Sequence, residues 1–390
     1  MDQARRAERI DSLTGLRIVP AIVVLLSHVE RPPGAGKVLR SFLTAGYCGV
    51  TMFFVLSGFV IAHNYFDRFK SDFSLKVLWS YVVARLARVY PLYLLVLLWV
   101  SVPKLLSGSY GLLWLRHALA LQAWDPSLGR AYTFNGPGWS ISVEFFFYAA
   151  FPLLVLVLSP AARKARNAVL ALLLVVALIG LVTLWFVANG YGDLDWADPR
   201  SAHRWLYRNP LCRLGDFTVG VLAALLLAAL RREARRDWRV LGNVAVAIGA
   251  GSFLVLMCWS GLTYRAASWD FAYVLPAALL ILGLGLTPGS FASRALGTKP
   301  LLLLGEASYA VYLCHAWMLR HIHIFPVGSP SPWLVVQGCN IVLVLAVAIG
   351  LHLAFERPAR QFVRWSLDPS VRRHRTNRVE QMSVDMAAHP

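Results

Sequence analysis

The sequence predicts an all-α protein that crosses a membrane about ten times, and its composition and the spacing of its apolar stretches predict this. Of its 390 residues, 58% are hydrophobic and only 15% are charged, whereas about a quarter of the residues of a soluble protein are charged. Apolar stretches long enough for a helix to cross the hydrocarbon layer recur along the chain. This apolar excess needs lipid to face, so the protein is predicted to lie in the bilayer.

Ten apolar stretches are long enough, or nearly so, to span a bilayer. They cover residues 13–29, 46–65, 77–103, 138–158, 168–189, 209–230, 240–259, 271–287, 301–325 and 334–355. A further stretch, Gly111–Ala123, is too short to span and contains Arg116 and His117. It predicts a re-entrant or interfacial helix.

The basic residues set the expected orientation. An even number of spans places both termini on one side, and the positive-inside rule makes that side the cytoplasm. The segments that then face the cytoplasm hold most of the lysines and arginines, including the cluster Arg231–Arg239. The net charge of +18 is therefore explained by membrane topology, which argues against a nucleic-acid partner. No cleavable signal peptide is evident, because the first apolar stretch contains Arg17 and lacks a small-residue cleavage site.

We predict one membrane-embedded domain, residues 1–366, followed by a basic tail, residues 367–390, whose polar composition is typical of disorder. The five cysteines include no CxxC pair, which favours buried small hydrophobes over disulfides or a metal site. No metal site, P-loop or dinucleotide fingerprint is found, and the oligomeric state is left open.

Arg17 and His28 are the first candidate functional residues. Ionisable side chains are costly inside a membrane and indicate function there by default. The two residues are eleven positions apart on the first predicted helix, which corresponds to about 16 Å along its axis. One helix thus carries a cation near the inner face and a titratable imidazole near the outer face.

Arg85 and Arg88 follow at the inner end of the third predicted helix. Their i, i+3 spacing places both guanidiniums on one helical face. Two planar guanidinium groups, each able to donate two parallel hydrogen bonds, suit phosphate oxygens. The alternative is that both are ordinary positive-inside anchors.

Glu144 lies about one and a half turns into the helix that opens after Gly136-Pro-Gly, at the same predicted depth as His28. A carboxylate beside an imidazole fixes its tautomer and raises its basicity, as in a general base. The alternative is a structural hydrogen bond or a pair with an arginine, because a buried carboxylate needs some partner.

Four other features are interpreted structurally or held more loosely. Gly58 and its neighbour Ser57 predict a close approach of two helices. The i, i+3 spacing of Arg213 and Asp216 predicts a neutralising pair. We interpret His315 as a hydrogen-bonded interior histidine and expect Glu306 to help line a ligand cavity.

Taken together, the motifs resemble the acyltransferase-3 family of bacterial membrane O-acyltransferases over about residues 10–360. Each motif is short, but the ordered set with these spacings is specific. The motifs are Arg17-x10-His28 after Ser12-Leu-Thr-Gly-Leu, Gly49-Val-x3-Phe54-x2-Ser57-Gly58, Arg85-x2-Arg88-x-Tyr90-Pro91, Trp139-Ser140-x-Ser142-x-Glu144-Phe and Glu356-Arg357-Pro358.

The resemblance implies transfer of an acyl group, commonly acetyl from acetyl-CoA, to a hydroxyl of a carbohydrate or glycosylated acceptor, in the bacterial inner membrane. It implies that His28 is the catalytic histidine, that Arg17, Arg85 and Arg88 are essential basic residues and that Glu144 is the acidic residue. Many members carry an additional SGNH-type domain, which we expect this chain to lack. Acyl-CoA is expected as a substrate, with no permanently bound cofactor.

The residues suggest how such a reaction would run. Arginines at the inner face would hold the phosphates of acyl-CoA, while His28, oriented by Glu144, would deprotonate the acceptor hydroxyl near the outer face. Trp139, Ser140 and Ser142 are candidates for stabilising the oxyanion. A variant acylates His28 first, and the sequence does not separate the two.

Two other functions are compatible with intramembrane charge. A transporter or flippase for a lipid-linked glycan would also place arginine, histidine and glutamate in the bilayer, but no internal symmetry of the kind common in transporters is found. A non-catalytic partner of a glycan-assembly complex is the other, and the intact set of candidate residues argues against it.

Overall fold

The computed structural model describes residues 10–108, 110–232, 237–322, 324, 332–369 and 371. Within these ranges every regular element is a helix and no strand occurs. Of the predicted basic tail, residues 367–390, only 367–369 and 371 are described.

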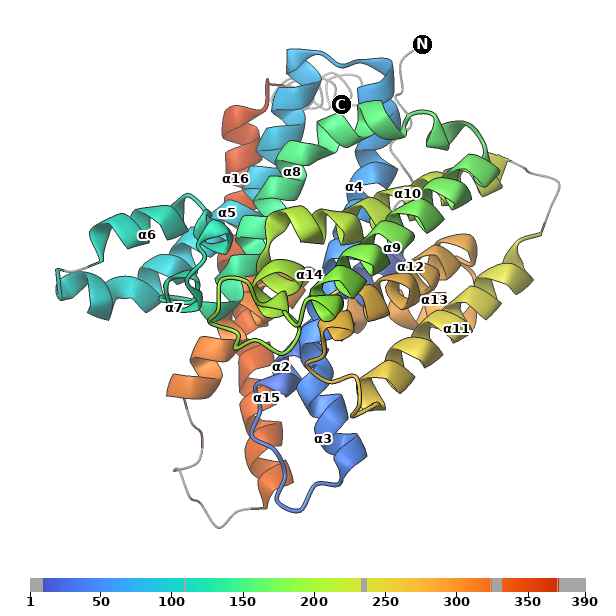
Figure 1. Cartoon of the computed structure of the whole chain (residues 1–390). Helices are drawn as coiled ribbons and strands as arrows, with labels where there is room; N and C mark the ends of the chain where they lie inside the picture. The colour runs from blue at the N-terminus through green and yellow to red at the C-terminus, as the bar shows by residue number, and fades with distance from the viewer. Residues whose placement is uncertain are drawn as a thin grey trace, which may run out of the picture.

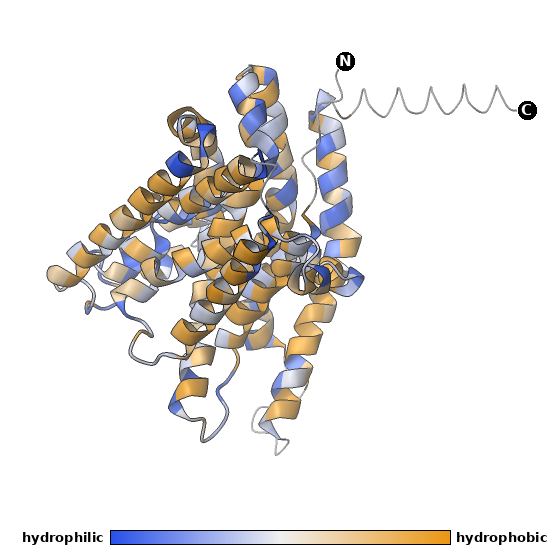
Figure 2. Cartoon of the chain, turned by 90° about the vertical axis from the view of Figure 1, so that its right-hand side faces the viewer, coloured by the Kyte–Doolittle hydropathy of each residue, from blue (hydrophilic) through white to orange (hydrophobic). Residues whose placement is uncertain are grey.

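Nine helical segments in the described ranges are long and apolar enough to cross a membrane, so the protein is an all-α, multi-pass membrane protein. Figure 1 shows α4 and α10 close together near the middle of the fold, and Figure 2 shows that hydrophobic residues predominate along the helices. The long helices are α4 (Gly49–Ser71), α5 (Leu75–Leu106), α8 (Trp139–Leu158), α9 (Ala165–Ala188), α10 (Pro210–Arg232), α11 (Arg239–Cys258), α12 (Phe271–Leu286), α14 (Lys299–His321) and α15 (Trp333–Leu351).

The first predicted span differs from the other nine. It forms two short helices, α1 (Asp11–Leu16) and α2 (Ile18–Ser27), which meet at Arg17. Pro20 explains the break, because its nitrogen has no hydrogen to donate to the carbonyl of Leu16, four residues earlier. The first predicted span is therefore helical but interrupted, it is not among the nine long helices of the described ranges, and the interruption lies at a predicted site residue.

Short helices fill the connections. They include α3 (Lys37–Thr44), which precedes α4, and α13 (Phe291–Leu296), which precedes α14. The predicted short helix between the third and fourth spans is present as α6 (Gly111–Ala118) and is followed by α7 (Leu128–Ala131). It ends earlier than predicted, because Ala120 adopts a φ of 52°, a left-handed conformation that cannot continue a right-handed helix.

The α4–α10 crossing requires glycine on both helices. A Cβ at Gly58 would lie 2.0 Å from the carbonyl oxygen of Phe217, and one at Gly220 would lie 1.9 Å from that of Val55. The two backbones are therefore in direct contact, which confirms the predicted role of Gly58.

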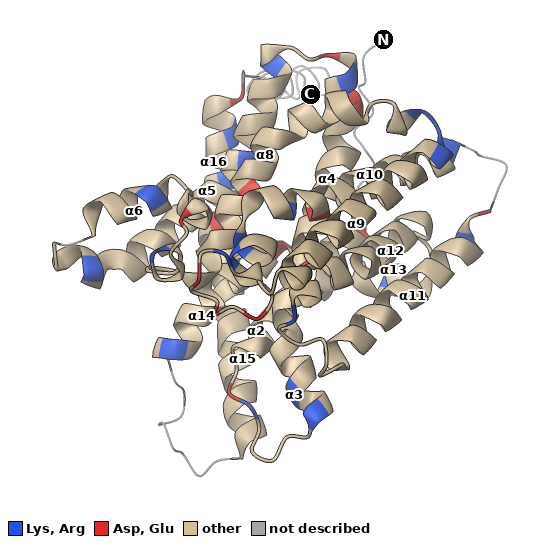
Figure 3. Cartoon of the chain, in the orientation of Figure 1, with Lys and Arg blue, Asp and Glu red and all other residues tan. Residues whose placement is uncertain are grey.

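Helices from the N-terminal and the C-terminal parts of the described chain meet at one end of the helix bundle. The Trp333 indole, at the start of α15, donates to the carbonyl of Glu30 just after α2, at 2.9 Å. The end of α2 and the start of α15 therefore lie at the same end of the bundle. Helix α1, which precedes α2, and the C-terminal helix α16 (Arg357–Leu367), which follows α15, both lie away from that end. Lys and Arg lie mainly at helix ends and in loops (Figure 3). That α1 and α16 face the cytoplasm stays a prediction.

Candidate functional site

A cavity of about 520 Å³ lies between the α1–α2 junction and α4, α5, α8, α14 and α16. This volume lies within the range of small-molecule binding sites. Six segments that are distant in the chain contribute to the cavity wall. The wall includes residues of the motifs that were identified in the sequence.

The cavity is strongly positive. Among the described residues that line it there are five arginines and a single carboxylate, Glu144. The structure thus brings together the three arginines predicted from sequence and adds two from α16. The five are Arg17, Arg85, Arg88, Arg360 and Arg364.

Arg88 is held in place by a buried network. It forms an ion pair with Glu356, and its other terminal nitrogen lies 3.5 Å from the carbonyl of Glu306. Glu356 accepts a second hydrogen bond from Nδ1 of the fully buried His352, at 2.9 Å. These two residues begin and end the π-helix η7 (His352–Glu356), a widened turn of the kind often found at functional sites. Glu356, known from its motif alone, therefore positions Arg88.

Arg85 has no carboxylate partner in the described part of the chain. Its guanidinium carbon lies 5.1 Å from the ring centroid of Tyr65, and one terminal nitrogen lies 3.5 Å from the Tyr65 hydroxyl. The aromatic ring orients the guanidinium without neutralising it. Its charge is therefore available to a bound anion.

Glu144 lines the cavity but does not meet His28. It accepts hydrogen bonds from the Tyr148 hydroxyl, at 2.5 Å, and the Ser57 hydroxyl, at 3.2 Å. Tyr148 is one turn further along α8, on the same face as Glu144. The predicted contact between Glu144 and His28 is therefore wrong, and the alternative of a structural hydrogen bond describes these contacts. Ser57, interpreted as a packing residue, also lines the cavity.

His28 closes α2, and the main chain orients its ring. Its Nδ1 lies 3.0 Å from the carbonyl oxygen of Val24 and 3.2 Å from the Ser27 hydroxyl. A carbonyl oxygen only accepts, so Nδ1 carries the hydrogen of the neutral ring and Nε2 keeps the lone pair. The Val24 carbonyl thus fixes the tautomer, the role predicted for Glu144.

A second histidine packs against His28. The ring centroids of His28 and His315 are 4.7 Å apart, with their planes at 75°. His315 is fully buried, and its Nδ1 donates to the carbonyl of Tyr312 at 2.7 Å, which confirms its interpretation as a hydrogen-bonded interior histidine. Tyr312 lines the cavity, and its ring centroid is 5.9 Å from that of His315. Consecutive ring contacts thus lead from the cavity wall to His28.

Only one of the three oxyanion candidates lines the cavity. Ser140 does, with its hydroxyl donating to the carbonyl of Pro137 at 3.0 Å. Trp139 is buried against Tyr207, with 4.7 Å between ring centroids. Ser142 is also buried, and its hydroxyl accepts from the backbone N–H of Ala123 at 3.2 Å. Trp139 and Ser142 are therefore buried outside the described lining of the cavity. The prediction that they stabilise the oxyanion is not supported by their positions.

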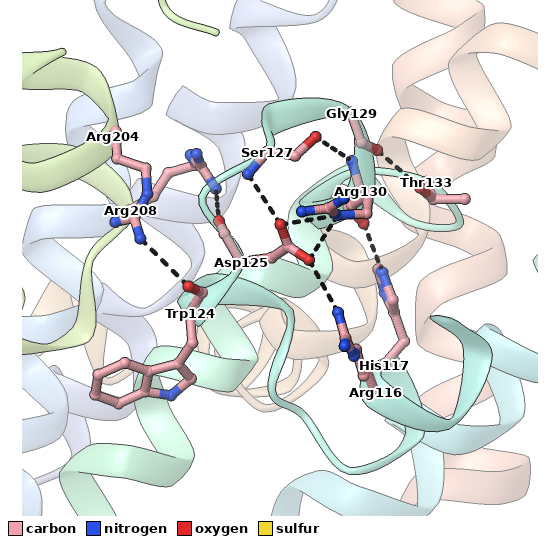
Figure 4. A network of polar contacts seen from close by, with 10 residues as sticks. All are labelled: Arg116, His117, Trp124, Asp125, Ser127, Gly129, Arg130, Thr133, Arg204 and Arg208. Atoms are coloured by element: carbon pink, nitrogen blue, oxygen red, sulfur yellow. Dashed lines mark hydrogen bonds and ion pairs between the residues drawn. The ribbon is translucent and has the colours of Figure 1, made fainter. Parts of the chain in front are cut away.

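The loop before α8 is organised around Asp125 (Figure 4). The carboxylate accepts from Nε of Arg130 at 2.9 and 3.0 Å, from Arg116 at 3.4 Å and from the backbone N–H of Ser127 at 2.9 Å. His117 donates from Nε2 to the carbonyl of Arg130 at 2.9 Å. The charged pair Arg116 and His117, read from sequence as a sign of a short helix, thus ties α6 to α7.

The connection before α10 is anchored to the same loop. Arg204 and Arg208, on the π-helix η5 (His203–Arg208), donate to the carbonyls of Trp124 and Asp125 at 3.3 and 3.4 Å (Figure 4). Two connections that are about eighty residues apart in sequence therefore fix the start of α8, which carries Ser140 and Glu144.

We expect Asp125→Asn to destabilise the protein at neutral pH by about 1–2 kcal/mol, because it removes a charge-assisted interaction with half-exposed arginines. Burial raises the pKa of Asp125, but the hydrogen bonds from Arg130 and Ser127 and the nearby positive charges outweigh it and hold the pKa below its ordinary value. A carboxyl with a lowered folded pKa stabilises above its unfolded pKa and loses that contribution as the pH falls through the folded value. Thermal unfolding should therefore separate variant and wild type at pH 7 and bring them together only at a pH well below the ordinary value of 3.8, once the pH has fallen through the folded pKa. An equal difference at both pH values would contradict this role.

Comparison with known proteins identifies the family of the chain. The model of the acyltransferase domain family matches residues 10–351. The chain is 30% identical over 381 residues to acyltransferase MdmB of Streptomyces mycarofaciens, covering 92% of this chain and 93% of that protein. It is 24% identical over 369 residues to the O-acetyltransferase OatA of Staphylococcus aureus, covering 90% of this chain but 57% of that protein.

No solved structure matches the chain. The matches to acyltransferases favour an enzyme over the transporter and scaffold alternatives, and the family model covers the cavity segments other than α16. The chain belongs to the acyltransferase domain family and is a membrane-embedded O-acyltransferase.

Proposed function

We propose that the enzyme transfers an acyl group, acetyl in the simplest case, from cytoplasmic acyl-CoA to a hydroxyl of a carbohydrate or glycosylated acceptor. The bacterial inner membrane is the proposed location. The observation that supports acyl-CoA as the donor is that five arginines and a single carboxylate line, among the described residues, a cavity of about 520 Å³. The planar guanidinium group of arginine binds phosphate oxygens through two hydrogen bonds, and acyl-CoA carries a diphosphate and a separate phosphate on its ribose.

The donor then spans the site from its arginines towards His28. The positive-inside rule places the arginines of α5 near the cytoplasm, where acyl-CoA is made. Arg17 and His28 are separated by about 16 Å, a distance that the extended pantetheine arm can cover. The thioester passes Tyr312 and approaches His28 and His315.

At that end His28 acts as the general base. Its Nε2 takes the proton of the acceptor hydroxyl, the oxygen attacks the thioester carbonyl, and collapse of the tetrahedral intermediate forms the ester and expels CoA thiolate. The thiolate then takes the proton from His28. Ser140 is the remaining oxyanion candidate at the cavity. Transfer through an acyl-His28 intermediate uses the same nitrogen, and trapping of an acyl-histidine would distinguish it.

The acetyl group and an oxygen acceptor are supported by the relative OatA, whose name describes an O-acetyltransferase. The name of MdmB specifies an acyltransferase and no acceptor. The proposed donor therefore rests on the geometry of this chain, and the proposed acceptor rests on the similarity to its relatives.

Acetyl-CoA binding to the detergent-purified protein, measured by calorimetry, tests the donor. We expect Arg85→Gln to weaken binding about 10- to 100-fold, the usual worth of a charged hydrogen bond that is removed. Arg68→Gln, at the exposed end of α4 and outside the cavity, is the matched control and should bind as the wild type does. Absence of acetyl-CoA binding to the wild type would overturn the proposed donor.

A further inference from the structure

Helix α16 lies along the first part of α5 and completes the cavity. The indole of Trp79 donates to the carbonyl of Leu367 at 2.8 Å, and the Ser80 hydroxyl donates to Asp368 at 2.9 Å. At the other end, the ion pair of Arg88 with Glu356, the residue directly before α16, attaches the start of α16 to α5. Since Trp79 meets the end of α16 and Arg88 its start, the two helices are antiparallel, and α16 is fixed at both ends.

Arg360 and Arg364 lie between these two attachments. They are four residues apart, so they share a helical face at about 6 Å separation along the axis, and both line the cavity with Gln361. Arg88 is neutralised by Glu356, whereas neither α16 arginine has an ion pair within the described residues. Two cations without a direct ion pair in the described part of the chain, Arg360 and Arg364, therefore face the same cavity as Arg17 and Arg85.

The position of α16 places Arg364 nearer the start of α5 than Arg85 and Arg88. Arg364 lies about 12 Å along α16 from Glu356, towards the start of α5 and away from the Arg88 end. Arg364 is exposed and Arg360 is half-buried, as expected at the mouth of a cavity. An anion that Arg360 and Arg364 hold thus lies on the α16 side of the cavity and nearer its mouth than one held by Arg85 and Arg88.

Acyl-CoA offers such a second anion. Its diphosphate continues directly into the pantetheine arm and so must lie deeper, whereas its 3′-phosphate projects from the ribose at the nucleotide end. We propose that Arg360 and Arg364 bind the 3′-phosphate of acyl-CoA and make the enzyme selective for it over dephospho-acyl-CoA. This inference rests on the proposed acyl-CoA donor and extends it to a nucleotide subsite on α16.

The same arginines could instead meet lipid phosphates, because α16 also exposes Phe362 and Trp365, side chains that suit the membrane interface. The cavity favours the nucleotide, since Arg360 and Arg364 line it while Arg357, on the same helix, does not. Arg357 therefore serves as the matched control for a test.

The test measures binding of acetyl-CoA and of acetyl-dephospho-CoA to the full-length protein in lipid-free dodecyl maltoside. We expect the wild type and Arg357→Gln to bind acetyl-CoA at least about 10-fold more tightly than the dephospho form. The double variant Arg360→Gln/Arg364→Gln should lose this difference and bind the dephospho form as the wild type does, which also shows that it is folded.

Equal wild-type affinities for the two donors would overturn the subsite and leave the acyl-CoA donor intact. Retention of the wild type, but not the double variant, on phosphatidylglycerol vesicles together with equal donor affinities would assign the arginines to lipid instead. A wild type that binds neither donor would overturn the proposed donor, and the subsite with it.

Discussion

Replacing His28 by alanine is expected to lower acyl transfer by about 10²- to 10⁴-fold, the contribution of a general base, while acetyl-CoA binding stays within about twofold. Binding is spared because His28 does not line the described cavity wall, whereas transfer depends on its Nε2. The measurement is release of CoA thiol by the purified enzyme supplied with membrane extract as a source of acceptor, alongside calorimetric binding.

His321→Ala is the matched control for this prediction. His321 lies in the last turn of α14, is exposed, and also donates from Nδ1 to a main-chain carbonyl, that of Trp317 at 2.9 Å. It shares the local hydrogen bonding of His28. In the described part of the chain, however, its ring packs on Trp317 and not on His315, which connects His28 to the cavity. A His28→Ala enzyme that retains more than a tenth of wild-type turnover would show that another group is the base.

The contacts of His28 change how its role is understood. In a general base that a carboxylate supports, the carboxylate raises basicity and stabilises the imidazolium. Here the Val24 carbonyl holds Nδ1, and a second imidazole, that of His315, packs on the ring. The arrangement orients Nε2 without a carboxylate, so Glu144 is left to organise the cavity wall between α4 and α8 through Ser57 and Tyr148. Whether Glu144 also acts in catalysis stays a prediction.

The features that depend on local sequence could be predicted. Apolar length located nine of the long helices, and the spacing of Arg85 and Arg88 placed both on one face, where both line the cavity. The i, i+3 pair of Arg213 and Asp216 is confirmed, with 2.6 Å between nitrogen and oxygen. Each of these follows from helix geometry alone.

The features that depend on which helices meet could not. Similar depth suggested that Glu144 meets His28, but depth does not determine which neighbour α8 faces, and Ser57 and Tyr148 are nearer. Arg360 and Arg364 fall close to the predicted tail, where arginines are common topology signals. Only the fold shows that α16 continues beyond η7 along α5 and aims both at the cavity.

Replacing Arg213 by methionine is expected to cost about 3–5 kcal/mol of stability, because it leaves the Asp216 carboxylate buried without its counter-charge. Both side chains are fully buried. Arg213 also donates to the carbonyl of Trp269 at 2.5 Å and to Thr51 at 2.8 Å, and its guanidinium carbon lies 5.0 Å from the ring centroid of Phe54. Loss of Arg213 would therefore also release a residue of the cavity wall, since Phe54 lines the cavity.

Unfolding of the purified protein in increasing dodecyl sulfate measures this cost. The exposed ion pair of Arg200 and Asp198, at 3.2 Å, provides the control, and Arg200→Met should leave the stability close to that of the wild type because solvent screens the pair. Removing both charges in Arg213→Met/Asp216→Leu should recover much of the loss, because no uncompensated carboxylate then remains from the pair. If Arg213→Met unfolded with Arg200→Met, or if the double variant were less stable than the single one, the pair would not be what holds α10 against α4 and the segment before α12.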